Sequence, residues 1–114
     1  MINAKFVSGT GDAAQGSADQ TIIAAQGTGK KIFVQKGYVS VVLVAASAGG
    51  EVALEDGVGG TRFFEADADA LGVYPFDFGE PGFPLSADTL LNLTVDGSAG
   101  NQATANATIT GIVI

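Results

Sequence analysis

The chain contains no cysteine, no histidine and no tryptophan among its 114 residues. Without cysteine it can form neither a disulfide nor a thiolate metal site. Without histidine it has no Ser-His or Cys-His pair, the usual basis of nucleophilic catalysis. We therefore predict that the protein is not an enzyme and that it uses no cofactor.

Positive charge is also scarce, because 5 lysines and arginines stand against 12 aspartates and glutamates and leave a net charge of −7. A chain this acidic is repelled by nucleic acid and by anionic lipid, so we expect neither as a partner. The longest strongly apolar run, residues 39–48, has about half the length that a bilayer span needs. The start, MINAKFVSGTGD, has no cationic segment followed by an apolar one, so we expect a cytoplasmic product.

Helical periodicity is absent, and short alternating or apolar runs separated by glycine recur instead. This pattern is typical of a sandwich or barrel, so we predict one all-β domain over residues 1–114 with about eight strands. Residues 1–18 are a candidate N-terminal arm, and residues 8–19 and 77–88 are expected to be loops. The expected strands are Ala4–Val7, Gln20–Ala25, Lys31–Gln35, Tyr38–Ala45, Glu51–Glu55, Thr61–Glu65, Leu71–Phe76, Thr89–Val95 and Ala103–Ile114.

The last two expected strands have the clearest pattern. In TLLNLTVDG, the side chains of Leu91, Leu93 and Val95 fall on one face and mostly polar ones on the other. In ATANATITGIVI, apolar residues alternate with threonine and asparagine until Ile112 and Ile114 place apolar side chains on the polar face. Period-two alternation predicts one buried and one solvated face. The apolar end of the last strand suggests that it is buried against something else.

The two strands expected at residues 31–35 and 38–45 are denser in apolar side chains. Such density is typical of central strands whose two faces are both covered. Lys36 and Gly37 lie between them, and we expect this pair to form a tight connection.

Two segments have the appearance of binding motifs. GTGKKIFV, residues 27–34, lacks the G-x-x-x-x-G-K-[ST] spacing and the following helix of a phosphate loop, so we interpret it as a turn entering a strand. The alternating acids Glu65, Asp67 and Asp69 do not fit the calcium loop of an EF-hand. We interpret them as a solvated loop, and an irregular calcium site stays open.

Aromatic residues are concentrated between positions 63 and 83. They are Phe63, Phe64, Tyr74, Phe76, Phe78 and Phe83. The segment PFDFGEPGFPL is too apolar for an idle surface loop, and aromatics are enriched both in cores and in interfaces. The sequence leaves both roles open.

Taken in order, these segments resemble a family of small virion proteins of tailed bacteriophages. The resemblance covers residues 19–114 and rests on DQTIIAAQGTGKKIFV, a glycine-bounded middle, the aromatic-proline loop, and the closing segments LSADTLLNLTVDG and NQATANATITGIVI. It implies a jelly-roll-like β-sandwich that assembles into homo-oligomers, often trimers, on the particle surface. The roles it implies are capsid decoration (cement) or attachment within a head or tail fibre.

We therefore expect a structural virion protein that binds the outer shell as a symmetric homo-oligomer, with a trimer as the expected state. Its partner would be the major capsid protein or another virion protein, and such contacts would cover the edges of a sandwich. The candidate partner-binding residues are Phe76, Phe78, Pro81, Phe83, Ile112, Ile114, Lys30 and Lys31. The alternative is a carbohydrate- or receptor-binding module on a head or tail fibre, which needs exposed aromatics in a row or shallow groove.

Overall fold

The computed structural model describes residues 4–15, 19–43, 50–68, 71–96 and 103–114. Within these ranges the regular structure consists of β-strands. The strands are β1 (Lys5–Ala14), β2 (Gln20–Ile23), β3 (Ile32–Leu43), β4 (Glu51–Asp56), β5 (Arg62–Asp67), β6 (Gly72–Asp77), β7 (Phe83–Pro84), β8 (Leu91–Val95) and β9 (Ala103–Val113).

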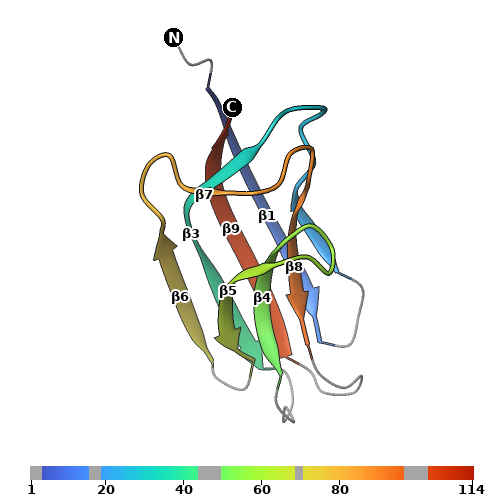
Figure 1. The fold of residues 1–114 in the computed structure, drawn as a ribbon. Coiled ribbons are helices and arrows are strands. Elements are labelled where there is room, and N and C mark those ends of the chain that lie inside the picture. Colours follow the sequence, from blue (N-terminus) through green and yellow to red (C-terminus); the bar gives the residue numbers. More distant parts are fainter. Residues whose placement is uncertain (1–3, 16–18, 44–49, 69–70, 97–102) are drawn as a thin grey trace.

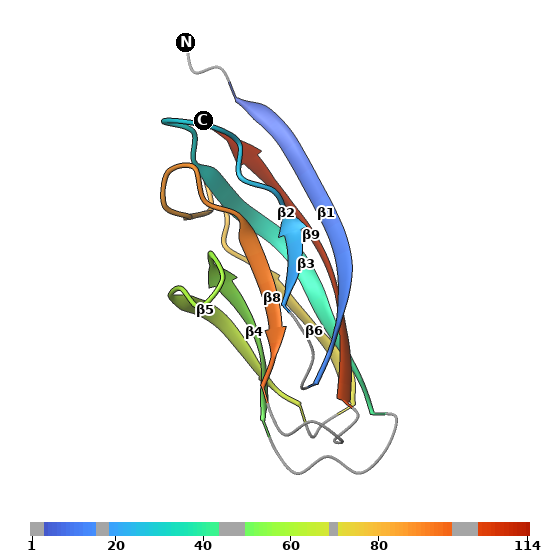
Figure 2. The ribbon, with the colours of Figure 1, turned by 90° about the vertical axis from the view of Figure 1, so that its right-hand side faces the viewer.

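The strands form two antiparallel sheets that pack face to face (Figures 1 and 2). The five-stranded sheet has the order β1-β9-β3-β6, with the short β7 also paired to β3. The four-stranded sheet has the order β2-β8-β4-β5. The prediction of an all-β protein is confirmed, and the two packed sheets form a β-sandwich.

The inner faces of the two sheets make one apolar core. The expected buried faces of the last two strands are confirmed, because Leu91, Leu93 and Val95 of β8 are buried, as are the alanines of β9. The expected solvated face is wrong at Asn92 of β8, which is also buried. The largest fully buried apolar side chains are Ile32, Leu54, Leu85, Leu91, Leu93, Ile109, Val34, Val39 and Val52. Burial of these side chains is the main favourable term that holds the sheets together.

The expected connection at Lys36 and Gly37 is wrong, because both residues lie inside the continuous strand β3. A register shift between Val34 and Lys36 marks a β-bulge opposite β9. A Cβ atom added at Gly37 would overlap the carbonyl oxygen of Thr108 on β9. Here glycine permits close approach of two backbones within the sheet, and does not mark a turn.

The expected loop at residues 8–19 is also wrong over its first half, because β1 continues to Ala14 and pairs with β9 along its whole length. Residues 5–14 of the candidate arm are thus part of the five-stranded sheet. A Cβ atom added at Gly9 would overlap the carbonyl oxygen of Ile22 on β2. The glycine lets the edges of the two sheets approach and close one side of the sandwich.

The expectation that both faces of the 38–45 segment are covered is wrong for the residues that are described. Tyr38 and Val42 on β3 are exposed, while Val39 and Val41 are buried. The outer face of the five-stranded sheet therefore carries apolar side chains that are exposed to solvent.

The sandwich is elongated, with extents of 51 × 23 × 18 Å. We call the end where β1 begins and β9 ends the terminal end, and the opposite end the far end (Figure 1).

Candidate functional site

A shallow apolar groove opens at the terminal end of the five-stranded sheet. Its volume is about 490 Å³, and it is lined by Ala4, Phe6, Gln35, Glu80, Pro81, Ile112 and Ile114. Phe6 is 86% exposed and Ile114 is 36% exposed. We call Phe6, Pro81, Ile112 and Ile114 the end patch. The structure thus brings together three of the candidate partner-binding residues: Pro81, Ile112 and Ile114.

Strand register explains why these side chains meet. Phe6 on β1 and Phe33 on β3 both lie opposite Ile112 on β9. Residues directly opposite one another on neighbouring strands project from the same face of a sheet. The three side chains therefore form one apolar row across three strands, on the outer face. Ile112 was among the predicted partner-binding residues, whereas Phe6 was not, because no pattern in the sequence indicates that β1 pairs with the distant β9.

The three phenylalanines of the candidate set, Phe76, Phe78 and Phe83, lie elsewhere, in an aromatic cluster between β5 and β6. Phe64 of β5 lies 5.0 Å from Phe76 of β6, and Phe63 stacks on Phe83 of β7 at 4.6 Å between ring centroids. Phe78 contacts both Phe76 and Phe83 from the loop and is itself exposed. Phe63, Phe64, Phe76 and Phe83 are half-buried and pack against the core. β5 and β6 are the edge strands on the side of the sandwich away from β1 and β2. The aromatic cluster fills the space between these two edges, so its main role is to pack the two sheets together.

The two candidate lysines flank the end patch. Lys30 and Lys31 are both exposed, and Lys31 exchanges two backbone hydrogen bonds with Ile114, each at 3.1 Å. The backbone oxygen of Lys30 accepts a hydrogen bond from the amide of Asp88 at 2.8 Å. These lysines are therefore positioned at the rim of the terminal end.

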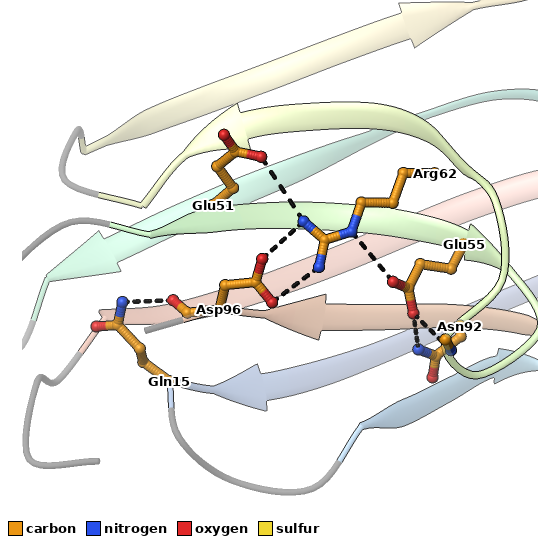
Figure 3. Close-up of polar contacts among 7 residues, drawn as sticks. Gln15, Glu51, Glu55, Arg62, Asn92 and Asp96 are labelled. Carbon is orange, nitrogen blue, oxygen red and sulfur yellow. Dashed lines mark hydrogen bonds and ion pairs between the residues drawn. The ribbon is translucent and has the colours of Figure 1, made fainter. Parts of the chain in front are cut away.

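A polar cluster around Arg62 lies on the outer face of the four-stranded sheet (Figure 3). The Arg62 guanidinium makes a bidentate contact with the Asp96 carboxylate at 2.7 and 2.8 Å. Its Nε donates to the buried carboxylate of Glu55 at 3.2 Å, and its Nη1 lies 3.7 Å from Glu51. Glu55 also accepts hydrogen bonds from Asn92 Nδ2 at 2.8 Å and from the Gly59 amide at 3.1 Å. The cluster ties β4, β5 and β8 together.

Charge in this cluster shifts two carboxyl pKa values in opposite directions. The hydrogen bonds that Arg62 donates lower the pKa of Asp96 below its ordinary value. A hydrogen bond to Glu65 and the negative charge of that residue raise the pKa of Glu51. The cluster is therefore one strong ion pair beside a pair of mutually repelling carboxyl groups.

The same acids line an open groove of about 640 Å³ toward the far end, formed by Gly50, Glu51, Glu65, Ala66, Asp67 and Asp96. Among the residues that the structure describes, no group of three acidic side chains is arranged to hold a metal ion. Asp69, the third acid of the sequence motif, lies outside the described residues. Glu65 and Asp67 are on the exposed outer face of β5. The expected strand ended at Glu65, and the expectation of a loop is wrong for Asp67, because β5 extends to that residue.

A second apolar groove, of about 450 Å³, lies on the outer face of the five-stranded sheet. Tyr38, Val73 and Pro75 provide its apolar surface. Lys36, Asp77, Thr108 and Thr110 surround them. Tyr38 is 41% exposed. This arrangement offers one aromatic platform with polar neighbours.

Neither a protein-family model nor a curated protein matches this chain. In the described ranges, no helix has the length and apolar character needed to cross a membrane. The virion resemblance of the sequence therefore stays a prediction, and the surfaces of the molecule are what bear on its function.

Proposed function

We propose that the protein is a structural component of a tailed-phage virion, a capsid decoration (cement) protein that binds the outer shell as a homo-oligomer. The observation that carries this proposal is the end patch, where Phe6 is 86% exposed beside Pro81, Ile112 and Ile114. Large apolar side chains gathered on a surface are typical of a docking site. A building block needs such a surface and needs no reaction centre.

We propose further that the sandwich is a jelly roll. A jelly roll has eight strands in two sheets, arranged as two Greek keys. The orders β1-β9-β3-β6 and β2-β8-β4-β5 support this assignment, because the first and last strands are neighbours and the connections repeatedly cross between the sheets. Jelly rolls serve as capsid and lectin domains alike, so the fold is compatible both with a cement protein and with a carbohydrate-binding module.

The protein would bind its partners by burying surface area at each contact. A specific interface buries at least about 1,000 Å² in total. The outer face of the five-stranded sheet adds Phe33, Tyr38, Val42 and Val73 to the end patch. Many copies on one particle would add avidity without further contacts.

Gold-labelled antibody against the purified chain tests the virion assignment. Intact tailed-phage particles should be labelled on the head surface in electron micrographs. Particles that stay unlabelled while the free chain is found in the lysate would overturn the virion assignment.

Assembly is tested separately by size-exclusion chromatography with light scattering. We expect a mass that is a multiple of one chain, and a lower mass when Ile112 and Ile114 are both changed to serine.

The second candidate function is carbohydrate binding on a fibre. The observation in its favour is the groove at Tyr38, which combines an exposed ring with Asp77, Thr108 and Thr110 as hydrogen-bonding neighbours. A glycan library screened by thermal shift is the test. A sugar that raises Tm for the wild type and leaves Tm of Tyr38→Ala unchanged would favour this function over cement. The absence of any shift would remove it.

A further inference from the structure

The lysines are confined to one end of this acidic molecule. Lys5 lies opposite Val113, Lys31 pairs with Ile114, and Lys36 lies opposite Thr110, all on strands that reach the terminal end. Lys30 adjoins Lys31. All four lysines of the sequence are therefore at the terminal end, and the single arginine is held by the carboxylates of the polar cluster.

Carboxylates are distributed the other way. At the terminal end, Asp77, Glu80 and Asp88 lie among the lysines, so the charges there nearly cancel. Toward the far end there is no lysine. The acidic residues described there are Asp12, Asp19, Glu51, Glu65, Asp67 and Asp96. The net charge of −7 is therefore concentrated away from the end patch.

We infer that copies of this chain associate through their terminal ends, with the far ends directed away from one another. This inference rests on the proposed homo-oligomer and identifies the surface that forms it. The occupant of the end patch is a second copy, because lysines and carboxylates mixed around an apolar centre can pair across a contact between identical ends. A contact between far ends would bring unbalanced carboxylates together.

The length of the molecule keeps the acidic far ends of associated copies apart. The molecule is 51 Å long, whereas charges in physiological salt are screened beyond about 8 Å. Copies joined at the terminal end would therefore feel little repulsion between their far ends. The edge strand β6 is a poorer contact, because Pro75 has no amide hydrogen to donate to an added strand.

Salt dependence distinguishes this arrangement from the alternatives. Because the terminal end is nearly neutral, the dissociation constant of a contact between two terminal ends should change little between low and high NaCl. A head-to-tail contact of lysines on far-end carboxylates would weaken steeply as NaCl rises. A contact between far ends would strengthen as NaCl rises, since salt screens the repulsion.

The test is analytical ultracentrifugation of the full chain and two matched variants. Phe6→Ser removes the most exposed apolar side chain of the end patch, and Leu71→Ser removes a side chain that is 65% exposed at the far end. We expect Phe6→Ser to raise the dissociation constant at least about tenfold, as loss of a central anchor does, and Leu71→Ser to leave it unchanged. The melting temperatures of both should match the wild type, because neither side chain is part of the core.

The other possible results overturn either the terminal-end contact or the proposed assembly. An oligomer that Phe6→Ser leaves intact and Leu71→Ser disrupts, or one that weakens steeply with NaCl, overturns the terminal-end contact and leaves the proposed assembly standing. A wild type that stays a single chain at every concentration overturns the assembly itself. If Phe6→Ser does not fold, Lys31→Glu decides, because extra negative charge at the terminal end should weaken the contact.

Discussion

Arg62 is the residue on which the outer face of the four-stranded sheet depends. Its guanidinium joins the bidentate Asp96 contact, the buried Glu55 carboxylate and Glu51. Bidentate arginine–carboxylate pairs are among the stronger polar contacts in proteins. Removal of one partner leaves the other charges without compensation, which costs more than the pair contributes when intact.

We expect Arg62→Met to lower the free energy of unfolding by about 2 kcal/mol at pH 7, mainly because Glu55 stays buried without its cation. Arg62 lowers the pKa of Asp96, so the stability from this pair is present above the ordinary pKa of 3.8 and is lost as the pH falls through the lower folded value. Denaturant unfolding of wild type and variant from pH 7 to pH 2 checks this. Their difference should shrink below about pH 3.8, and a difference independent of pH would contradict the ion-pair explanation.

Single residues are the hardest feature to foresee from the sequence. Alternation places Asn92 on a solvated strand face, but it is fully buried beneath the polar cluster and donates to Glu55. Nothing in its own strand indicates this, because its cover comes from Arg62 and Glu55 on other strands. The same holds for Phe6, whose place in the end patch depends on its register with Ile112.

At the scale of strands, glycine has two roles that a sequence does not separate. Gly57 and Gly59 have φ values of +81° and +73° and occupy the turn between β4 and β5, as turn glycines do. Gly37 instead lies within β3, where an added Cβ would overlap the Thr108 carbonyl oxygen.

Gly37→Ala should therefore destabilise the protein by about 2 kcal/mol or more, since the backbones of β3 and β9 must move apart. Gly72→Ala is the matched control in the same sheet. A Cβ there would lie 3.4 Å from the Tyr74 ring, an ordinary contact, and we expect a change below about 0.5 kcal/mol. Thermal unfolding of both variants decides the point, and equal effects would contradict the close-approach role.

Strand prediction succeeds where alternation is uninterrupted and fails where glycine breaks it. The patterns of β8 and β9 predict the buried face correctly, because period-two burial follows directly from the pleat. In β1 and β3, glycines that permit close backbone contact have the same appearance as loop or turn signals. Sheet order is not predictable from the pattern, since it depends on pairings between distant parts of the chain, such as β1 with β9.

At the scale of the whole molecule, charge should control how far association proceeds. The sequence pI is about 4.1, so lowering the pH from 7 toward 4 takes the net charge of the molecule from −7 toward zero. With less repulsion between molecules, the far end can also make contacts, and we expect aggregates larger than the oligomer proposed at pH 7. Dynamic light scattering along a pH titration measures this. A particle size that stays constant through pH 4 would contradict the role given to the far-end charge.

Confinement of every lysine to the terminal end has a practical consequence. Reagents that couple to side-chain amines will attach this protein to a bead, a sensor chip or a gold particle by that end. The attached molecules would share one orientation and present their carboxylate-rich pole to the solution. Amine coupling would then block self-assembly and leave the opposite pole available to a ligand, whereas carboxyl coupling would invert the arrangement.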